Sequence, residues 1–264
     1  MRGWWQDLTD LVLPAECGGC GRPRTVLCQE CRAALSGAVP RRVRPVPEPP
    51  GLPEVRAAAP YGDEVRAVLL AHKERGALTL TGALGAALAG AVRAGLPAAG
   101  RAGGPGPVLL VPVPSARRAV RARGHDPVRR IALAAAGELR RGGTAARVVA
   151  VLRQRRAVAD QSGLDWRRRL DNLAGALEVT AGGARLLGGG PLVLVDDLIT
   201  TGATLTEAAR AVREALVRDG GRMLVYAQAT REEMGERRAG STGGTVIRAA
   251  VIAAPPDSFE MNRN

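Results

Sequence analysis

The segment that most constrains the fold is Leu192–Thr206, which reads LVLVDDLITTGATLT. Its first four residues are apolar, so they predict a short strand that is buried on both faces of a sheet. Two carboxylates follow, and a loop of small hydroxyl residues then leads into a helix that the apolar spacing predicts from about Leu205 to Arg218. A buried strand that passes through a short loop into a helix is the building unit of parallel α/β sheets.

The rest of the chain repeats this alternation of strands and helices. Apolar residues at helical spacing begin near Tyr61 and continue through Val92, and an Ala-rich helix is expected to end near Arg140. Further strands are expected at Val108–Val113, Val148–Leu152, Met223–Ala229 and Thr245–Ala253. Only 2% of the residues are aromatic, so the core must be built from Ala, Val and Leu. The sequence therefore predicts an α/β fold with a mostly parallel sheet flanked by helices.

We divide the chain into three parts. Residues 1–56 hold an N-terminal helix, the cysteines and a Pro-rich linker, residues 57–254 form the α/β domain, and residues 255–264 form a flexible tail. The helix over residues 1–13 is amphipathic, which favours docking on the body of the protein, with a membrane surface as the alternative. No run approaches the ~18 apolar residues that span a membrane, and acidic residues interrupt any signal-peptide core. We therefore expect a cytoplasmic protein without membrane insertion.

The four cysteines form two CxxC pairs, Cys17/Cys20 and Cys28/Cys31, separated by seven residues. Two such pairs complete a tetrahedral shell of thiolates, which is the arrangement of structural zinc sites. Two disulfides and unligated cysteines are the alternative interpretations, and a reducing compartment favours zinc. Because four sulfurs leave no coordination position open, the zinc would be structural.

The loop after the strand Leu192–Val195 has the chemistry to bind a ribose 5-phosphate. Thr200–Thr204 can surround a phosphate with backbone N–H groups and hydroxyls at a helix N-terminus, where the helix dipole favours anions. Gly202 allows the backbone to approach closely. Asp196 and Asp197 stand where open α/β sheets bind ligands, and they can accept hydrogen bonds from ribose hydroxyls and stabilise positive charge at the anomeric carbon. The alternative is an acidic strand end before an ordinary Thr-capped helix.

The formal net charge of +13 is compatible with phosphate-bearing ligands but names none. Arginines crowd the stretch after the predicted strand at residues 108–113, namely Arg117, Arg118, Arg121, Arg123, Arg129 and Arg130. Guanidinium groups can grip a leaving pyrophosphate through paired hydrogen bonds. Lys73, the only lysine, is a further candidate phosphate ligand. The alternative for each of these residues is a solvated surface charge.

The segment VLVDDLITTGAT resembles the motif with which type I phosphoribosyltransferases bind 5-phosphoribosyl pyrophosphate (PRPP). The layout of the chain as far as about Arg218 resembles the ComF family, known for competence and DNA uptake in bacteria. The positions that carry this resemblance are Cys17, Cys20, Cys28, Cys31, Tyr61, Lys73, Val111–Pro114, Arg121–Gly124, Gln161–Leu164 and Arg169–Asn172. The family implies a zinc-ribbon-like module joined to a phosphoribosyltransferase fold, with the Arg-Gly segment placed over the pyrophosphate.

Together, the residue chemistry and the resemblance assign expected roles to three groups of residues. The catalytic pair is Asp196 and Asp197. The residues expected to bind PRPP with Mg²⁺ are Thr200, Thr201, Gly202, Ala203, Thr204, Arg121, Arg123 and Lys73. The residues expected to close over the ligand are Gln161, Arg169 and Asn172.

Two departures from the family pattern narrow this expectation. His125, Asp126 and Pro127 stand where the family usually has Phe-Asn-Gln, so no family role passes to them. Purine-salvage relatives carry an acidic residue at the position of Thr200, so purine salvage is disfavoured.

The resulting hypothesis is a ComF-like protein that binds PRPP and Mg²⁺ and transfers the phosphoribosyl group to an acceptor. One alternative is a non-catalytic competence factor that binds single-stranded DNA through the basic surface. Another is a regulator that senses PRPP without turnover. No motif in the sequence identifies the acceptor or the oligomeric state.

Overall fold

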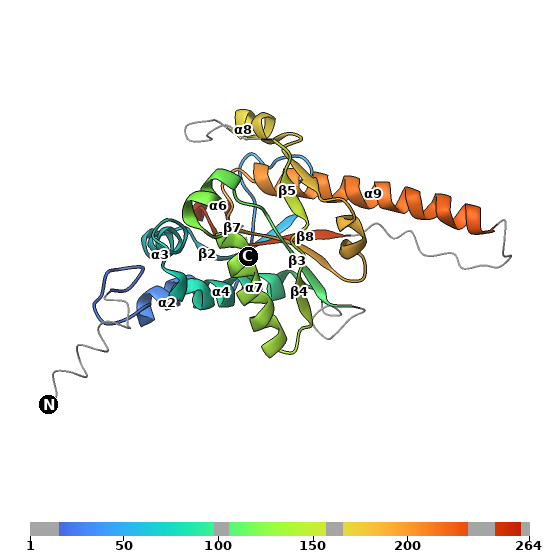
Figure 1. Cartoon of the computed structure of the whole chain (residues 1–264). Helices are drawn as coiled ribbons and strands as arrows, with labels where there is room; N and C mark the ends of the chain where they lie inside the picture. Colours follow the sequence, from blue (N-terminus) through green and yellow to red (C-terminus); the bar gives the residue numbers. More distant parts are fainter. Residues whose placement is uncertain (1–15, 98–105, 157–165, 232–245, 260–264) are drawn as a thin grey trace, which may run out of the picture.

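The computed structural model describes residues 16–97, 106–156, 166–231 and 246–259. Within them, a six-stranded sheet has the strand order β1-β2-β8-β7-β3-β4 (Figure 1). Its strands are β1 (Arg41–Val43), β2 (Glu54–Pro60), β8 (Ile247–Ala254), β7 (Leu192–Leu198), β3 (Val108–Pro112) and β4 (Ala146–Val148). All neighbouring strands are parallel except the edge strand β1, which pairs antiparallel with β2. The predicted α/β class and mostly parallel sheet are therefore confirmed.

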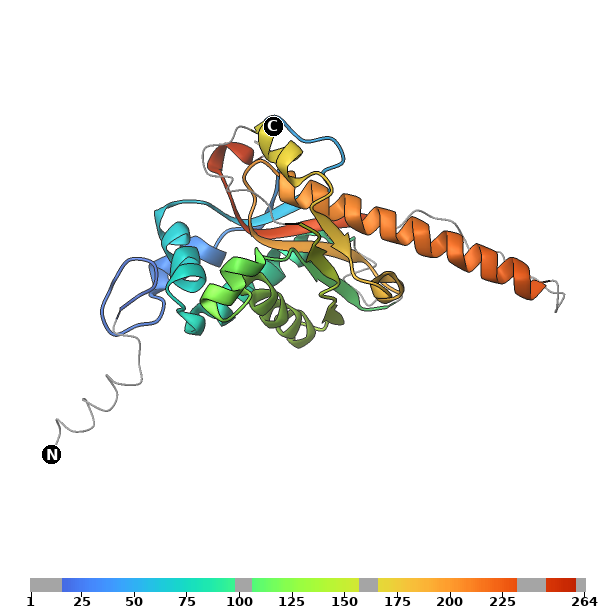
Figure 2. The ribbon, with the colours of Figure 1, turned by 45° about the horizontal axis from the view of Figure 1, so that its top comes forward.

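Helices cover both faces of this sheet (Figures 1 and 2). One face carries α3 (Asp63–Glu74), α4 (Thr81–Gly95) and α7 (Pro127–Arg141), and the other carries α9 (Ala203–Arg231), which runs out beyond the sheet. Because successive side chains of a strand point to opposite faces, a central strand needs apolar residues at every position. In β7, Val193 and Val195 join the core under α4 and α7, while Leu192 and Leu194 join the core under α9. This two-sided burial explains the uninterrupted apolar run in the sequence.

The segment Leu78–Gly95, which includes α4, is long and apolar enough to cross a membrane, with a mean hydropathy of 1.3. Its packing is that of a core helix, because α4 lies against α7 and against strands β2 and β8. Gly85 of α4 faces Ala134 of α7 so closely that an added Cβ would lie 2.5 Å from the Ala134 Cβ. The missing side chain at Gly85 therefore allows these two helices to approach closely.

Smaller elements surround the sheet. A second, two-stranded antiparallel sheet consists of β5 and β6. The remaining elements are β5 (Leu152–Gln154), β6 (Leu177–Val179), α2 (Gln29–Ser36), α6 (Arg117–Arg123), α8 (Trp166–Leu173) and three 3₁₀ turns, Leu78–Leu80, Gly183–Leu187 and Pro256–Ser258. The segment before α2 and α2 itself pack against α3 and α4, so the cysteine region shares a core with the α/β body.

Two of the strand predictions need correction. The strand predicted at Met223–Ala229 is wrong, because these residues continue α9, which ends at Arg231. A short apolar run fits a helix as well as a strand, and the preceding Gly220 and Gly221 do not end the helix. The single strand predicted at Val148–Leu152 is two strands in different sheets, since β4 ends at Val148 and β5 begins at Leu152.

The segments predicted as a linker and a flexible tail form regular structure at the edge of the sheet where β1 lies. The Pro-rich part of residues 1–56, predicted as a linker, contains β1 and the beginning of β2. In the C-terminal segment, residues 256–258 form a 3₁₀ turn, and Phe259 bridges Val43. The predicted helix at residues 1–13 lies outside the described residues.

Candidate functional site

The four cysteines converge on one point, with their sulfur atoms all within 4.8 Å of one another. Tetrahedral Zn–S bonds of about 2.3 Å place sulfurs about 3.8 Å apart, and Cys20 Sγ lies 3.6 Å from Cys28 Sγ. A disulfide would need about 2.05 Å, so the cluster fits a four-thiolate metal site and does not fit two disulfides. This geometry supports the predicted zinc site.

The backbone around the cysteines is shaped to bring the sulfurs together. The N–H of Gly21 donates to the carbonyl of Cys17 over 2.9 Å and closes the first turn. Cys28 is the N-cap of α2, where its Sγ accepts from the N–H of Cys31 over 3.5 Å. An added Cβ at Gly19 would lie 2.6 Å from Cys31 Sγ, so this position needs glycine.

The same backbone favours ionised sulfur at Cys17. Burial raises the pKa of Cys17, but hydrogen bonds from the backbone N–H groups of Cys28, Cys20 and Gly19 outweigh burial and lower that pKa to about 6. Burial raises the pKa of Cys31, and a bound cation would offset this cost because metals bind the thiolate. Four protein ligands complete the shell, so the role of such a metal is structural.

The predicted carboxylate pair lies at the carboxyl end of β7, where Asp196 is partly buried and Asp197 is 7% exposed. Lys73 Nζ, at the end of α3, donates to Asp197 Oδ2 over 2.8 Å. The backbone N–H of Asp197 donates to Asp196 Oδ1 over 2.9 Å. The fold thus joins a lysine and a carboxylate that are 124 positions apart in the sequence.

The charges of this cluster are only partly balanced. Burial raises the pKa of Asp196 well above its usual range, and the negative charge of Asp197 raises it further, while Lys73 acts in the opposite direction. Burial lowers the pKa of Lys73, but attraction to Asp197 and the hydrogen bond between them outweigh burial and raise it. Hydrogen-bond donors or a cation from a ligand would therefore stabilise the ionised form of Asp196.

The loop at residues 199–202 carries the chain from β7 into α9. Gly202 has a φ of +77°, and an added Cβ there would lie 3.1 Å from Leu52 Cδ1, so both the backbone angle and the neighbouring segment require glycine. A hollow of about 30 Å³ is lined by Asp196 and residues 198–205. Thr200, one of the lining residues, is exposed to solvent.

The two predicted arginines of α6 differ in their surroundings. Arg123 pairs with Glu74 of α3, with 2.6 Å between Nη2 and Oε1 and 3.1 Å between Nε and Oε2. Arg121 is exposed on the same helix. The last turn of α3 therefore contacts both the carboxylate cluster, through Lys73, and α6, through Glu74.

The residues predicted to close over the ligand are only partly described. Arg169 and Asn172 belong to α8, which packs beside the loop through Leu173 against Ala203. Gln161 lies outside the described residues. The structure thus brings α8 next to the start of α9, and the closing role of these residues stays a prediction.

The two histidines, to which the sequence assigned no role, lie together beside Lys73. The ring centroids of His72 and His125 are 6.1 Å apart in an edge-on arrangement. Burial lowers the pKa of His72 to about 4, and the nearby His125 lowers it further, so His72 is neutral at physiological pH. His72 Nε2 lies 3.1 Å from Thr81 Oγ1. No spacing in the sequence indicates this pair, because the contact forms between α3 and the segment after α6.

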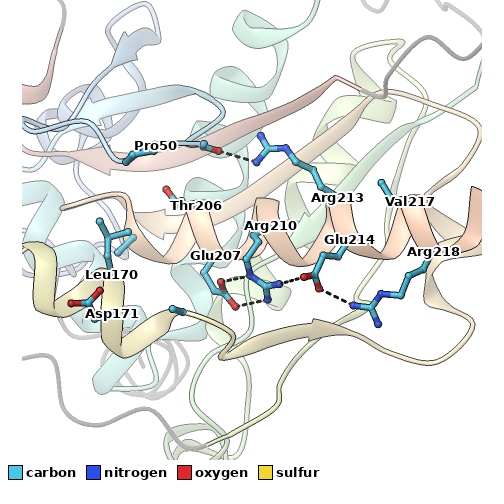
Figure 3. A pocket seen from close by; sticks show the side chains of 13 residues that line it. Pro50, Leu170, Asp171, Thr206, Glu207, Arg210, Arg213, Glu214, Val217 and Arg218 are labelled. Carbon is cyan, nitrogen blue, oxygen red and sulfur yellow. Dashed lines mark hydrogen bonds and ion pairs between the residues drawn. The ribbon is translucent and has the colours of Figure 1, made fainter.

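A separate cavity of about 710 Å³ lies along the first half of α9 (Figure 3). Its wall is formed by α9, by α8 and by the segment at Pro50 and Gly51. Ion pairs run along α9 beside it, from Glu207 to Arg210 (2.7 Å), from Arg210 to Glu214 (2.8 Å) and from Glu214 to Arg218 (2.7 Å). The i,i+3 and i,i+4 spacing of these residues is the sequence signal that could have revealed the ladder.

The buried end of this ladder attaches the second sheet to α9. Glu207 is 4% exposed, and its Oε1 accepts from the backbone N–H of Leu177 over 2.9 Å. Arg210 Nη2 donates to Glu207 Oε1 over 2.8 Å and to the carbonyl of Leu177 over 3.0 Å. Both backbone groups of Leu177 are therefore satisfied by α9, which gives Glu207 and Arg210 a structural role.

Replacing Glu207 with alanine should destabilise the protein by about 2–3 kcal/mol, because it leaves a buried N–H without an acceptor and removes one of the two carboxylates that pair with Arg210. The expected fall in Tm is about 4–12 °C, measured by calorimetry. Glu207→Gln is the matched control, since it keeps an oxygen for the N–H of Leu177 and should cost less. Equal losses in the two variants would contradict this assignment of the oxygen.

Comparison of this chain with protein-family models finds no match, and comparison with curated proteins finds none either. Candidate functions therefore rest on the residues and their geometry.

Proposed function

We propose that this chain binds PRPP at the carboxyl edge of the parallel sheet, as a ComF-like protein with a phosphoribosyltransferase-type domain and a structural zinc site. The observation that carries the proposal is the position of the Asp196, Asp197 and Lys73 cluster next to the loop Thr200–Thr204 at the start of α9. A sugar phosphate presents an anion and two hydroxyls at a fixed separation. The site offers a helix N-terminus for the first and carboxylates for the second.

Each part of the site has a role in this proposal. The loop Thr200–Thr204 binds the 5-phosphate through backbone N–H groups and hydroxyls. Asp196 and Asp197 accept hydrogen bonds from the ribose hydroxyls, and their negative charge favours positive charge at the anomeric carbon. Mg²⁺, when bound with the ribose hydroxyls and the pyrophosphate, supplies charge neutralisation. Lys73, Arg121 and Arg123 contribute cations on the pyrophosphate side in this proposal.

Transfer of the phosphoribosyl group would follow from the same arrangement. The bond between the anomeric carbon and pyrophosphate breaks, and its electron pair leaves with the pyrophosphate. A lone pair on the acceptor forms the new bond to that carbon, and the acceptor's proton passes to the departing pyrophosphate or to water. The protein contributes by holding the reacting atoms in place and by stabilising charge as the bond breaks.

The test is calorimetric titration of the purified protein with PRPP in the presence of Mg²⁺. We expect one ligand per chain with a Kd between about 1 μM and 1 mM, the range in which enzymes hold their substrates. Ribose 5-phosphate alone should bind more weakly, because it lacks the pyrophosphate. The absence of PRPP binding at millimolar concentration would refute the proposal. Release of pyrophosphate with an added nucleobase or amine would distinguish a transferase from a PRPP-sensing regulator.

Single-stranded DNA binding is a second candidate, and α6 is the observation that favours it. This helix has no buried residue and exposes Arg117, Arg118 and Arg121. Cations exposed along one helix can contact successive phosphates, and such binding weakens steeply with salt. DNA binding of this kind should survive Asp197→Ala, and its absence at low salt would rule the candidate out.

A further inference from the structure

Helix α6 contacts α3 through its last residue, Arg123. α6 has no buried residue and ends at Arg123, with Gly124, whose φ is +73°, as its C-cap. At this end, Arg123 places two donor nitrogens on the two carboxylate oxygens of Glu74. Paired hydrogen bonds of this kind fix both the position and the plane of a guanidinium.

The residue after Gly124 adds a second attachment at the same point. His125 Nδ1 lies 3.1 Å from the carbonyl of Arg123, so this ring nitrogen donates to that oxygen. The ring of His125 meets His72 of α3 edge-on. The carboxyl end of α6 therefore lies against the last turn of α3 through both Arg123 and His125.

Two adjacent residues of α3 involve the cations that the proposed ligand would need: Lys73 is one such cation, and Glu74 pairs with another, Arg123. Lys73 pairs with Asp197 of the carboxylate cluster, and Glu74 pairs with Arg123 of α6. Side chains of Arg123 and Glu74 are 19% and 48% exposed, so water reaches the carboxylate more easily than the guanidinium. An ion pair with one side in water is weak and can be exchanged for a stronger anion.

We propose that Glu74 is a latch that holds Arg123 in the ligand-free protein and that the pyrophosphate of a bound ligand displaces it. This inference rests on the proposed function, because that function supplies the pyrophosphate. Pyrophosphate carries more negative charge than one carboxylate and presents several oxygens to the same nitrogens of Arg123. Glu74 therefore competes with the ligand and lowers its affinity, and α6 is released from α3 when the ligand binds.

Replacing Glu74 with glutamine removes the competing charge and keeps the size of the side chain. We expect the affinity for PRPP with Mg²⁺ to rise by about two- to five-fold, the factor that corresponds to one exposed ion pair. Backbone amide hydrogen exchange in Arg117–Arg123 should be faster than in the wild type without any ligand, because α6 opens more often. If Glu74 instead positions Arg123 for the ligand, Glu74→Gln should lower the affinity for PRPP.

The matched control is Glu64→Gln, on an exposed residue in the first turn of the same helix. It lies ten residues away, about 15 Å along α3, and it changes the net charge by the same amount. A gain in affinity for Glu74→Gln beyond that of Glu64→Gln, with faster exchange in α6, would support the latch. Binding by the wild type without such a gain, or unchanged exchange in α6, would overturn the latch alone. Absence of PRPP binding in all three proteins would overturn the latch together with the proposed function.

Discussion

Replacing Cys28 with serine is expected to abolish metal binding at the four-cysteine cluster and to lower the Tm by at least about 10 °C. Structural zinc sites contribute about 10–16 kcal/mol to the folding of small zinc-dependent peptides. Even a third of that energy corresponds to about 10 °C, since a chain of this size loses about 2–4 °C per kcal/mol. The loss should report the missing sulfur ligand, because serine can still cap α2 and the backbone N–H of Cys28, which donates to Cys17 Sγ over 3.3 Å, is unchanged.

The loss should extend beyond the cysteine segment. Cys28, Cys31 and Leu35 share a buried core with Val68 of α3 and Leu84 of α4. Without the metal, the burial that raises the pKa of Cys31 is no longer offset, so this side of the shared core should loosen.

Zinc content and thermal unfolding test this expectation together. The wild type should carry one zinc per chain by elemental analysis, and chelation should reproduce the fall in Tm seen in Cys28→Ser. Ser36→Ala is a suitable control, because Ser36 is exposed on the same helix and should leave zinc content unchanged. A Cys28→Ser protein that keeps equimolar zinc and an unchanged Tm would contradict a structural metal site.

The sequence predicted the elements whose signal is local. The apolar run before Asp196 identified β7, because a central parallel strand is apolar on both faces. The spacing of Cys17, Cys20, Cys28 and Cys31 identified their convergence, because two tight turns suffice to bring four sulfurs together. The strand predicted at Met223–Ala229 was wrong, because the spacing of apolar residues in so short a run does not distinguish a strand from a helix.

Contacts between distant segments could not be predicted in the same way. The ion pair from Lys73 to Asp197 depends on α3 ending at the same sheet edge as β7, which is a property of strand order. Strand β8 lies between β2 and β7 in the sheet but comes last in the sequence. The pairing of Glu74 with Arg123 depends on the same topology. By contrast, the ion pairs of Glu207, Arg210, Glu214 and Arg218 had a local signal, the i,i+3 and i,i+4 spacing on one helix.

Replacing Asp196 with asparagine should weaken PRPP binding by about 10- to 150-fold and at the same time raise the Tm at neutral pH. The loss of affinity is the value of a hydrogen bond to a charged acceptor, here a ribose hydroxyl on the proposed site. The gain in stability follows from the raised pKa of Asp196, which burial and the charge of Asp197 cause. Asparagine keeps an oxygen at the position of Oδ1, so the hydrogen bond from the N–H of Asp197 can persist.

The sign of the pH dependence follows from the direction of this pKa change. Because the pKa of Asp196 is higher in the folded than in the unfolded protein, the folded state binds the proton more tightly. The free energy of unfolding of the wild type therefore decreases as pH rises from about 3.9, the ordinary pKa of aspartate, to the raised value, and stays lower above it. Asp196→Asn lacks this decrease, so its advantage in Tm should be present at neutral pH and absent in acid.

Calorimetric titration with PRPP and Mg²⁺, together with unfolding scans across pH, separates the two effects. Asp257→Asn provides the control, since Asp257 is exposed in the turn after β8 and removes the same charge. If PRPP binding in Asp196→Asn stays equal to that of the control, the carboxylate does not face the ribose. If the Tm of Asp196→Asn falls at neutral pH, the charge of Asp196 stabilises the free protein, which contradicts the expected gain in stability. Both results together would show that Asp196 lowers the stability of the free protein and raises the affinity for PRPP. Such a trade of stability for binding is typical of functional sites.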